Sequence, residues 1–193
     1  MKLYYTPRSH FARKVRLLAD ALAIGIELVD VGNVADADPE IFANNPLMRV
    51  PTLLDGEKWI IDSDHIAHYL VTHYDPGDKF SVLTDDVNTL NLRAIMNGIM
   101  SSEVEILLAK RTGTDVTMHK RFDKHAYAID KGLDWLEANV SMIPKEPCYT
   151  AFHLLSLWDH LEFCDLKRHD HPRLKKRISR FTDLPYVLKS RPR

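Results

Sequence analysis

The hydrophobic pattern of the chain changes at an Asp-Pro-Gly-Asp cluster at positions 75–78, and this change constrains the fold more than any other feature. Before the cluster, apolar runs of strand length alternate with amphipathic segments; after it, apolar residues recur at helical spacing over much longer stretches. Proline and glycine between aspartates interrupt regular structure, so the cluster is a natural domain boundary. The pattern predicts an α/β domain over residues 1–75, a linker over 76–84 and an all-helical domain over 85–193.

The first domain combines strand, helix and hairpin signals. Short aliphatic and aromatic runs indicate strands, and Asp55-Gly56 between two such runs indicates a hairpin. In the first helical segment the apolar residues share one face; Arg13 and Lys14 fall outside it, and Arg13 is expected to be solvated. The predicted elements are strands at 2–5, 26–31, 52–54 and 58–61 and helices at 11–22, 38–43 and 63–74. Their order is that of a thioredoxin-like domain.

The second domain carries helical patterns only. Two long helices are predicted, from about 85 to 111 and from about 115 to 140, with a turn containing Gly113 between them. A third, strongly apolar helix is predicted at 150–163. Pro172 opens a fourth helix, and one more turn is predicted after Pro185.

Charge and composition exclude several classes of function. Lys and Arg number 26 against 27 Asp and Glu, so no bulk charge favours nucleic acid or a membrane surface. No apolar run reaches the length of a membrane span, and the first residues contain no apolar core of a signal peptide. Two cysteines do not make a disulfide scaffold, so we expect a cytoplasmic protein.

Pro51 stands at the head of an apolar run that otherwise indicates a buried strand. Proline removes a backbone donor from the ladder, so it is tolerated only at the first position of a strand or on an edge. The residues alone leave two interpretations open: a loop that ends before an edge strand, or a functional turn.

Four stretches of the chain carry a family resemblance in their order and spacing. They are MKLYYTPRSHFARKVRLL at the start, NPLMRVPTL before the hairpin, DSDHIAHYL after it and RFTDLPYVLKSRPR at the end. Together they resemble the cytosolic glutathione S-transferase family over essentially the whole chain, with an active-site loop like that of its bacterial serine and cysteine classes. The resemblance implies a thioredoxin-like domain followed by a helical domain, glutathione as co-substrate, and a homodimer.

The resemblance also implies a glutathione site. Val50 and Pro51 match the family's Val-Pro pair, which implies a cis bond that frees the Val50 N–H and C=O to pair with the cysteinyl residue of glutathione. Arg49 matches a basic position that could reach the glycine carboxylate. Asp62 and Ser63 match the pair that binds the γ-glutamyl end, and we expect Ser63 to cap the helix that follows.

The hydroxyl that would activate the glutathione thiol has four candidates. Ser9 is favoured, because it precedes the first helix and matches the catalytic Ser or Cys of the serine and cysteine classes; a plain helix cap is the other interpretation. Tyr5 is the reserve, followed by Thr6 and by Tyr4, which aligns with the catalytic tyrosine of the tyrosine classes. The neighbouring His10 could tune the response to substrate or pH.

A second substrate is expected against the first long helix. Met96, Ile99 and Met100, together with His10, are candidate walls of this pocket, although core packing is an alternative role for the apolar three. In the third helix of the second domain, Thr150 to His153 matches the family's Ser/Thr-x-x-Asp capping box. His153 replaces the Asp and removes the carboxylate cap.

Metal and cysteine chemistry are not expected. His65 and His68 stand three residues apart without the spacing of a zinc signature. The disulfide-exchanging members of the family carry cysteine at the helix mouth, where this chain has Ser9. Cys148 and Cys164 lie in the helical half, so thiol transfer through a protein cysteine is not predicted.

The sequence therefore predicts a glutathione S-transferase-like enzyme that activates glutathione for attack on a small, mostly apolar electrophile. Two alternatives stay open. One is a non-catalytic protein-interaction module with the same fold, and the other is a glutathione-dependent reductase or isomerase.

Overall fold

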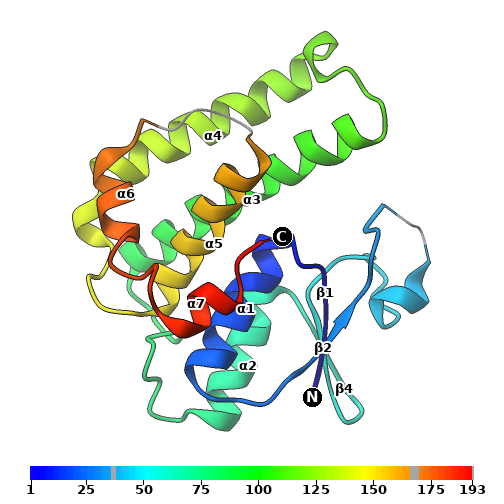
Figure 1. Cartoon of the computed structure of the whole chain (residues 1–193), viewed down its shortest axis with the longest axis vertical. Coiled ribbons are helices and arrows are strands. Elements are labelled where there is room, and N and C mark those ends of the chain that lie inside the picture. The colour runs from blue at the N-terminus through cyan, green and yellow to red at the C-terminus, as the bar shows by residue number, and fades with distance from the viewer. Residues whose placement is uncertain (36–37, 166–169, 193) are drawn as a thin grey trace.

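The computed structural model describes residues 1–35, 38–165 and 170–192 (Figure 1). Positions 166–169 and 193 of the predicted helical domain lie outside the described residues. The sheet domain and the helical domain pack side by side, and α1 lies between the sheet and α5.

The first domain is thioredoxin-like, as predicted. Its sheet has the strand order β2-β1-β3-β4, in which β1 and β2 are parallel and the other pairs are antiparallel. The elements are β1 (Lys2–Tyr5), α1 (His10–Ala21), β2 (Glu27–Asp30), η1 (Pro39–Phe42), β3 (Thr52–Asp55), β4 (Lys58–Ile61) and α2 (Ser63–Tyr74). The helix predicted at 38–43 is only the 3₁₀ turn η1, because Ala43 adopts a left-handed conformation with φ of 56° and ends it.

The second domain is helical, as predicted. It contains α3 (Val87–Arg111), η2 (Val116–Met118), α4 (Lys120–Ala138), η3 (Val140–Met142), α5 (Tyr149–Cys164), α6 (Pro172–Ile178) and α7 (Pro185–Lys189). The long helices α3 and α4 run beside each other as a hairpin (Figure 1). The helix predicted from about 115 is divided, because Asp115 caps the short η2 before α4 begins. Among the described residues, no helix is long and apolar enough to cross a membrane.

One apolar core crosses the domain boundary. Leu17 and Leu18 of α1 and Val71 of α2 belong to the same buried cluster as the interior of the helical domain. A smaller cluster lies between the sheet and the inner faces of α1 and α2. Because the first helix buries one side against the sheet and the other against α5, it carries polar groups into the boundary between the domains.

Gly132 on α4 allows the close approach of α3. A Cβ at this position would lie 2.6 Å from Ile99 Cγ1 and 2.7 Å from its Cδ1. We expect Gly132→Ala to lower the free energy of unfolding by about 1–3 kcal/mol through overpacking. Gly98→Ala is the control: its Cβ would meet nothing within 4 Å, so the higher helix propensity of alanine should raise stability by up to about 1 kcal/mol. Equal changes in the two urea unfolding curves would contradict the packing argument.

Candidate functional site

The register of the sheet brings three of the predicted segments to one edge, at which β1 and β4 end and β3 begins. Tyr4 of β1 pairs with Thr52 of β3, and Thr52 pairs with Ile61 of β4. The loop that follows β1, the Val50–Pro51 bond that precedes β3 and the Asp62-Ser63 pair that follows β4 are therefore neighbours. The loop after β1 leads directly into α1, so the N-terminus of that helix lies at the same edge.

The Val50–Pro51 peptide bond is cis. Within the described chain, no residue forms a hydrogen bond with the Val50 N–H or C=O. The preceding loop is held by Asn45, whose Nδ2 donates to Arg49 O at 3.0 Å and to Thr52 Oγ1 at 3.1 Å. Val50 thus offers a backbone donor and acceptor from a fixed loop, which is what an extended peptide needs in order to pair. Arg49 is exposed beside it.

Asp62, not Ser63, caps α2. Asp62 adopts a φ of 71°, and its Oδ1 accepts hydrogen bonds from Asp64 N at 2.8 Å and His65 N at 3.2 Å. The prediction that Ser63 is the cap was wrong: Ser63 is the first helical residue and is buried. The carboxylate prevails because an ionised acceptor makes stronger bonds to the free N–H groups than a hydroxyl does. The Ser63 hydroxyl is left unused by the cap.

Ser9 caps α1, and its Oγ accepts a hydrogen bond from Ala12 N at 3.1 Å. A serine hydroxyl has two acceptor lone pairs and one O–H donor, so capping leaves its hydrogen free for another partner. The capping and the thiol-binding interpretations of Ser9 are therefore compatible. The residue is partly exposed at the helix mouth.

The other hydroxyls are less suitably placed. Tyr5 is buried in the cluster between the sheet and α1, with the Arg16 guanidinium 5.0 Å from its ring centroid. Thr6 is also buried. Strand alternation places Tyr4 on the face of the sheet opposite to Leu3 and Tyr5, hence away from α1.

The predicted walls of the second-substrate pocket are buried. Met96, Ile99 and Met100 belong to the core shared by the two domains, and His10 is 2% exposed. These positions do not agree with a role as free pocket walls, because α3 uses this face to pack against other helices. A cavity of about 560 Å³ lies nearer the start of α3 instead. It is lined by Asp64, His68, Val82, Leu83, Thr84, Leu90, Arg93, Ala94, Asn97 and Tyr149.

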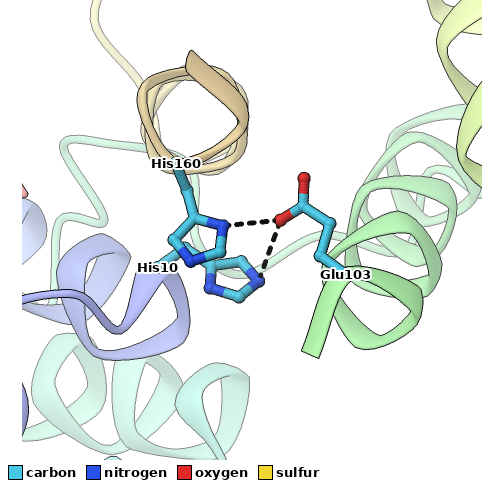
Figure 2. Close-up of side chains that lie close together, drawn as sticks. All are labelled: His10, Glu103 and His160. Carbon is cyan, nitrogen blue, oxygen red and sulfur yellow. Dashed lines mark hydrogen bonds and ion pairs between the residues drawn. The ribbon is translucent and has the colours of Figure 1, made fainter. Parts of the chain in front are cut away.

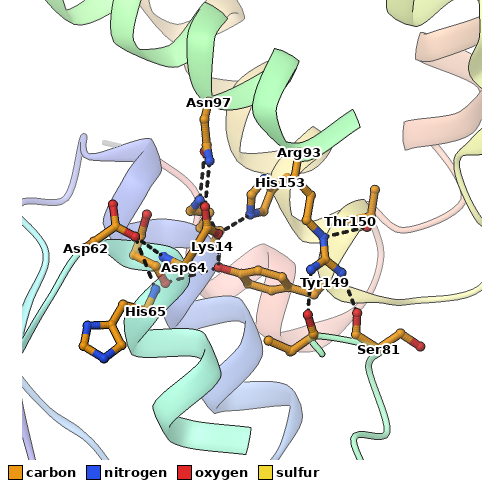
Figure 3. Close-up of polar contacts among 12 residues, drawn as sticks. Lys14, Asp62, Asp64, His65, Ser81, Arg93, Asn97, Tyr149, Thr150 and His153 are labelled. Atoms are coloured by element: carbon orange, nitrogen blue, oxygen red, sulfur yellow. Dashed lines mark hydrogen bonds and ion pairs between the residues drawn. The ribbon is translucent and has the colours of Figure 1, made fainter. Parts of the chain in front are cut away.

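Asp64 joins four helices beside the candidate site (Figure 3). Its Oδ1 accepts hydrogen bonds from Lys14 Nζ at 2.8 Å, Tyr149 OH at 2.8 Å and His153 Nε2 at 3.0 Å. Its Oδ2 accepts from Asn97 Nδ2 at 2.6 Å. These partners come from α1, α3 and α5, while Asp64 lies in the first turn of α2. The carboxylate therefore locks the two domains together.

The charges in this network set one another's ionisation. Burial opposes ionisation of Asp64, but hydrogen bonds from His153 and Lys14 and the positive charge of Lys14 outweigh it and hold its pKa well below the usual range. Burial and the nearby Lys14 lower the pKa of His153 to about 3, so this imidazole is neutral. Burial lowers the pKa of the Lys14 ammonium, and Asp64 opposes that shift. The network therefore centres on a buried Lys14–Asp64 ion pair.

Two sequence interpretations are corrected by these contacts. Arg13 is buried, not solvated, and its guanidinium forms an ion pair with Asp159 of α5 at 2.7 Å; Lys14, which falls outside the apolar face of the helix, is buried as well. The capping box at Thr150 to His153 does not form, because α5 begins at Tyr149 and Cys148 is its cap. Thr150 Oγ1 instead accepts a hydrogen bond from the Arg93 side chain at 3.2 Å (Figure 3). His153, which stands at the position of the capping acid, forms a hydrogen bond across the domain boundary with Asp64 of α2.

A second polar cluster lies deeper, behind the mouth of α1 (Figure 2). His160 Nδ1 of α5 donates to Glu103 Oε2 of α3 at 2.7 Å, and His10 Nε2 lies 3.5 Å from the same oxygen. The two imidazole rings stack with centroids 4.0 Å apart. Burial raises the pKa of Glu103. Burial alone would lower the pKa of His160, but hydrogen bonds to Cys164 and Glu103 and the Glu103 charge raise it to about 9.

The same three side chains are the one group in the described chain that could hold a metal ion, with ligand atoms within 4.8 Å of one another. In the structure a hydrogen bond joins His160 to Glu103, and the His10 Nε2–H donates to Met100 O at 3.0 Å. Sequence reasoning missed Glu103 and His160, because nothing local in a helical sequence marks two residues that meet across the core.

The fold defines a two-domain protein, with a thioredoxin-like domain followed by a helical domain, in which the first helix begins at the same edge as Val50 and Ser63. Residues 3–78 match the family model described as glutathione S-transferase, N-terminal domain. This part of the chain belongs to that family, and the whole chain has the glutathione S-transferase fold.

Solved structures are similar over the full length. A glutathione transferase family member from Pseudomonas fluorescens Pf-5 with bound glutathione is 25% identical, with a TM-score of 0.85 and coverage of 100% of this chain and 98% of that one. A glutathione S-transferase from Methylobacterium radiotolerans in complex with glutathione sulfonate is 20% identical, with a TM-score of 0.83 and coverage of 99% and 94%. A maleyl pyruvate isomerase, described as a bacterial zeta-class glutathione S-transferase, is 20% identical, with a TM-score of 0.76 and coverage of 100% and 97%.

Proposed function

We propose that the protein is a glutathione transferase that binds glutathione at the edge formed by Arg49, Val50, Pro51, Asp62 and Ser63, with the glutathione sulfur at Ser9. The observation that carries the proposal is the convergence of three unused groups. The Ser9 hydroxyl hydrogen, the Val50 backbone pair and the Ser63 hydroxyl lie on segments that the sheet register brings together. Similar structures hold glutathione or glutathione sulfonate, which supports glutathione as the ligand.

The energetics favour a hydroxyl donor at the helix mouth. A free thiol with a pKa of about 8.5 needs about 2.7 kcal/mol of preferential stabilisation of its anion for the pKa to fall by about two. A helix N-terminus supplies about 0.3–1 kcal/mol, and a hydrogen bond to a charged group supplies about 1.5–3 kcal/mol. Ser9 combines both contributions, so a dedicated base is not required. The thiolate then attacks an electrophilic carbon and forms a thioether.

Calorimetric titration of reduced glutathione near neutral pH tests the role of Ser9. We expect saturable binding with proton release in the wild type, and loss of the proton release in Ser9→Ala. Alanine also removes the cap of α1, at a cost of about 0.5–2 kcal/mol in stability, whereas glycine costs only a few tenths. Ser9→Gly is therefore the matched control for the fold, and Ser9→Thr keeps the hydroxyl.

Loss of proton release in both Ser9→Ala and Ser9→Gly, with retention in Ser9→Thr, would support the hydroxyl as the thiol donor. Unchanged proton release in all three variants would move the assignment to Tyr5 or Thr6. Absence of glutathione binding by calorimetry and by a second method would instead favour the non-catalytic interaction module.

The same proposal includes a homodimer in a reducing, cytoplasmic setting. The free thiols of Cys148 and Cys164 are compatible with that setting. Sedimentation equilibrium of the purified protein tests the oligomeric state, and a monomer mass at micromolar concentration would contradict the dimer.

A further inference from the structure

A cysteine, a histidine and a glutamate are connected at the C-terminal end of α5. Cys164 Sγ lies 3.5 Å from His160 Nε2, and His160 Nδ1 lies 2.7 Å from Glu103 Oε2. Glu103 is completely buried and His160 is 5% exposed, whereas Cys164 is partly accessible. An activated thiol nucleophile has three parts. They are a solvent-accessible sulfur, an imidazole in contact with it and a carboxylate that orients the imidazole.

The buried glutamate determines how the imidazole behaves. Because Glu103 accepts the Nδ1–H of His160, the Nε2 atom is the one that faces the sulfur and exchanges a proton with it. The His160 imidazolium is stabilised between the two groups, and its pKa of about 9 agrees with that geometry. At neutral pH His160 is therefore an imidazolium whose Nε2 faces the Cys164 sulfur.

This end of α5 lies against the mouth of α1. The His160 ring stacks on His10, the residue after Ser9, and the Arg8 guanidinium lies 5.7 Å from the centroid of the Phe163 ring, next to Cys164. Arg8 is exposed and cationic, which favours an anionic ligand between the two elements. The helical turn that ends at Cys164 therefore contacts the mouth of α1, where the glutathione sulfur is proposed to bind, through His160 and Phe163.

We propose that Cys164 is a second reactive centre of the protein, a nucleophilic thiol that exchanges with mixed disulfides of glutathione. The His160 imidazolium stabilises the Cys164 thiolate, which attacks the glutathione sulfur of the disulfide. The disulfide bond of the substrate breaks as the bond between Cys164 and glutathione forms, and the departing thiolate receives the proton from His160. Glu103 positions His160 throughout.

The return step rests on the proposed function. A second glutathione thiolate, held at Ser9, attacks the glutathione sulfur of the mixed disulfide on Cys164. This step releases glutathione disulfide and restores the protein thiol, so the overall reaction converts a mixed disulfide and one glutathione into a free thiol and glutathione disulfide. The first step needs only Cys164 and its two partners, and can be tested without the return step.

The experiment treats the reduced full-length protein with glutathione disulfide near neutral pH and follows the mass of the intact chain, with peptide mapping of the modified residue. We expect one glutathionyl group per chain, on Cys164. Cys148 is the internal control, because it is buried, its Sγ accepts a hydrogen bond from Ala151 N at 3.4 Å, and burial raises its pKa. In the wild type, Cys164 should react at least about tenfold faster than Cys148.

Variants separate activation from simple exposure. Cys148→Ser should leave the modification unchanged, and Cys164→Ser should abolish it. His160→Gln should slow modification of Cys164 about tenfold or more, because the cation that stabilises the thiolate is lost. Glu103→Gln should also slow it. Three results would each overturn the proposal: comparable rates of glutathionylation at the two cysteines of the wild type, no modification of the wild type, or an undiminished rate of modification in a folded His160→Gln variant. Failure of Ser9 to bind glutathione would leave these results unaffected.

Discussion

Asp64→Ala is expected to lower the free energy of unfolding by about 3 kcal/mol. The substitution leaves the Lys14 ammonium, which is 0% exposed, without its counter-ion in the boundary between the domains. Loss of one partner from a buried ion pair typically costs about 3–5 kcal/mol, and we take the lower end because the Asp64 side chain is 37% exposed. Urea unfolding monitored by circular dichroism measures the change.

Two further variants test the cause. In a Lys14→Met, Asp64→Ala double variant, the loss should be smaller than the sum of the two single losses, with a coupling energy of about 0.5–3 kcal/mol. Glu27→Ala is the control, because it breaks an exposed pair with Lys2 and should cost no more than about 1 kcal/mol. A loss below about 1 kcal/mol in Asp64→Ala would show that this carboxylate does not hold the domains together.

The stability of the wild-type protein is expected to fall between pH 6.5 and pH 9. His160 has a pKa raised from 6.5 to about 9, so the folded state binds its proton more tightly than the unfolded state. The contribution of His160 to the free energy of unfolding is fully present below about pH 6.5 and is lost as the pH rises through about 9. The shift of its pKa corresponds to a contribution of about 3 kcal/mol. Denaturant unfolding at both pH values measures it.

The groups that face His160 define the controls for this pH dependence. They are Glu103 from α3, His10 from α1 and Cys164 from its own helix. We expect His160→Gln to have a nearly flat profile over the same window and Cys148→Ser to keep the wild-type slope. A wild-type profile as flat as that of His160→Gln would contradict the assignment of the slope to this imidazole.

Much of the fold could be read from the sequence, because its signals are local. Strand pairing around Asp55-Gly56 and the start of α2 at Ser63 depend on residues that are neighbours in the chain. The capping predictions failed where two acceptors compete within a few residues. At α2 the Asp62 carboxylate prevails over the Ser63 hydroxyl, and at α5 the cap is Cys148, two residues before the expected Thr150.

The sequence by itself determined the order of strands and helices and the change from an α/β pattern to a helical one, because these follow from local periodicity. The site at Ser9, Val50 and Ser63 was implied by the family resemblance and is part of the proposed function. Only the tertiary structure decided which polar residues between the domains are buried and which partners they contact. Asp64 meets Lys14 and His153 from positions 50 and 89 residues away, and Glu103 meets His160 across 57. Such pairs leave no trace in local hydrophobicity, because a buried charge has the same residue type as a solvated one. Burial beside a partner, which the whole fold creates, is what distinguishes the two.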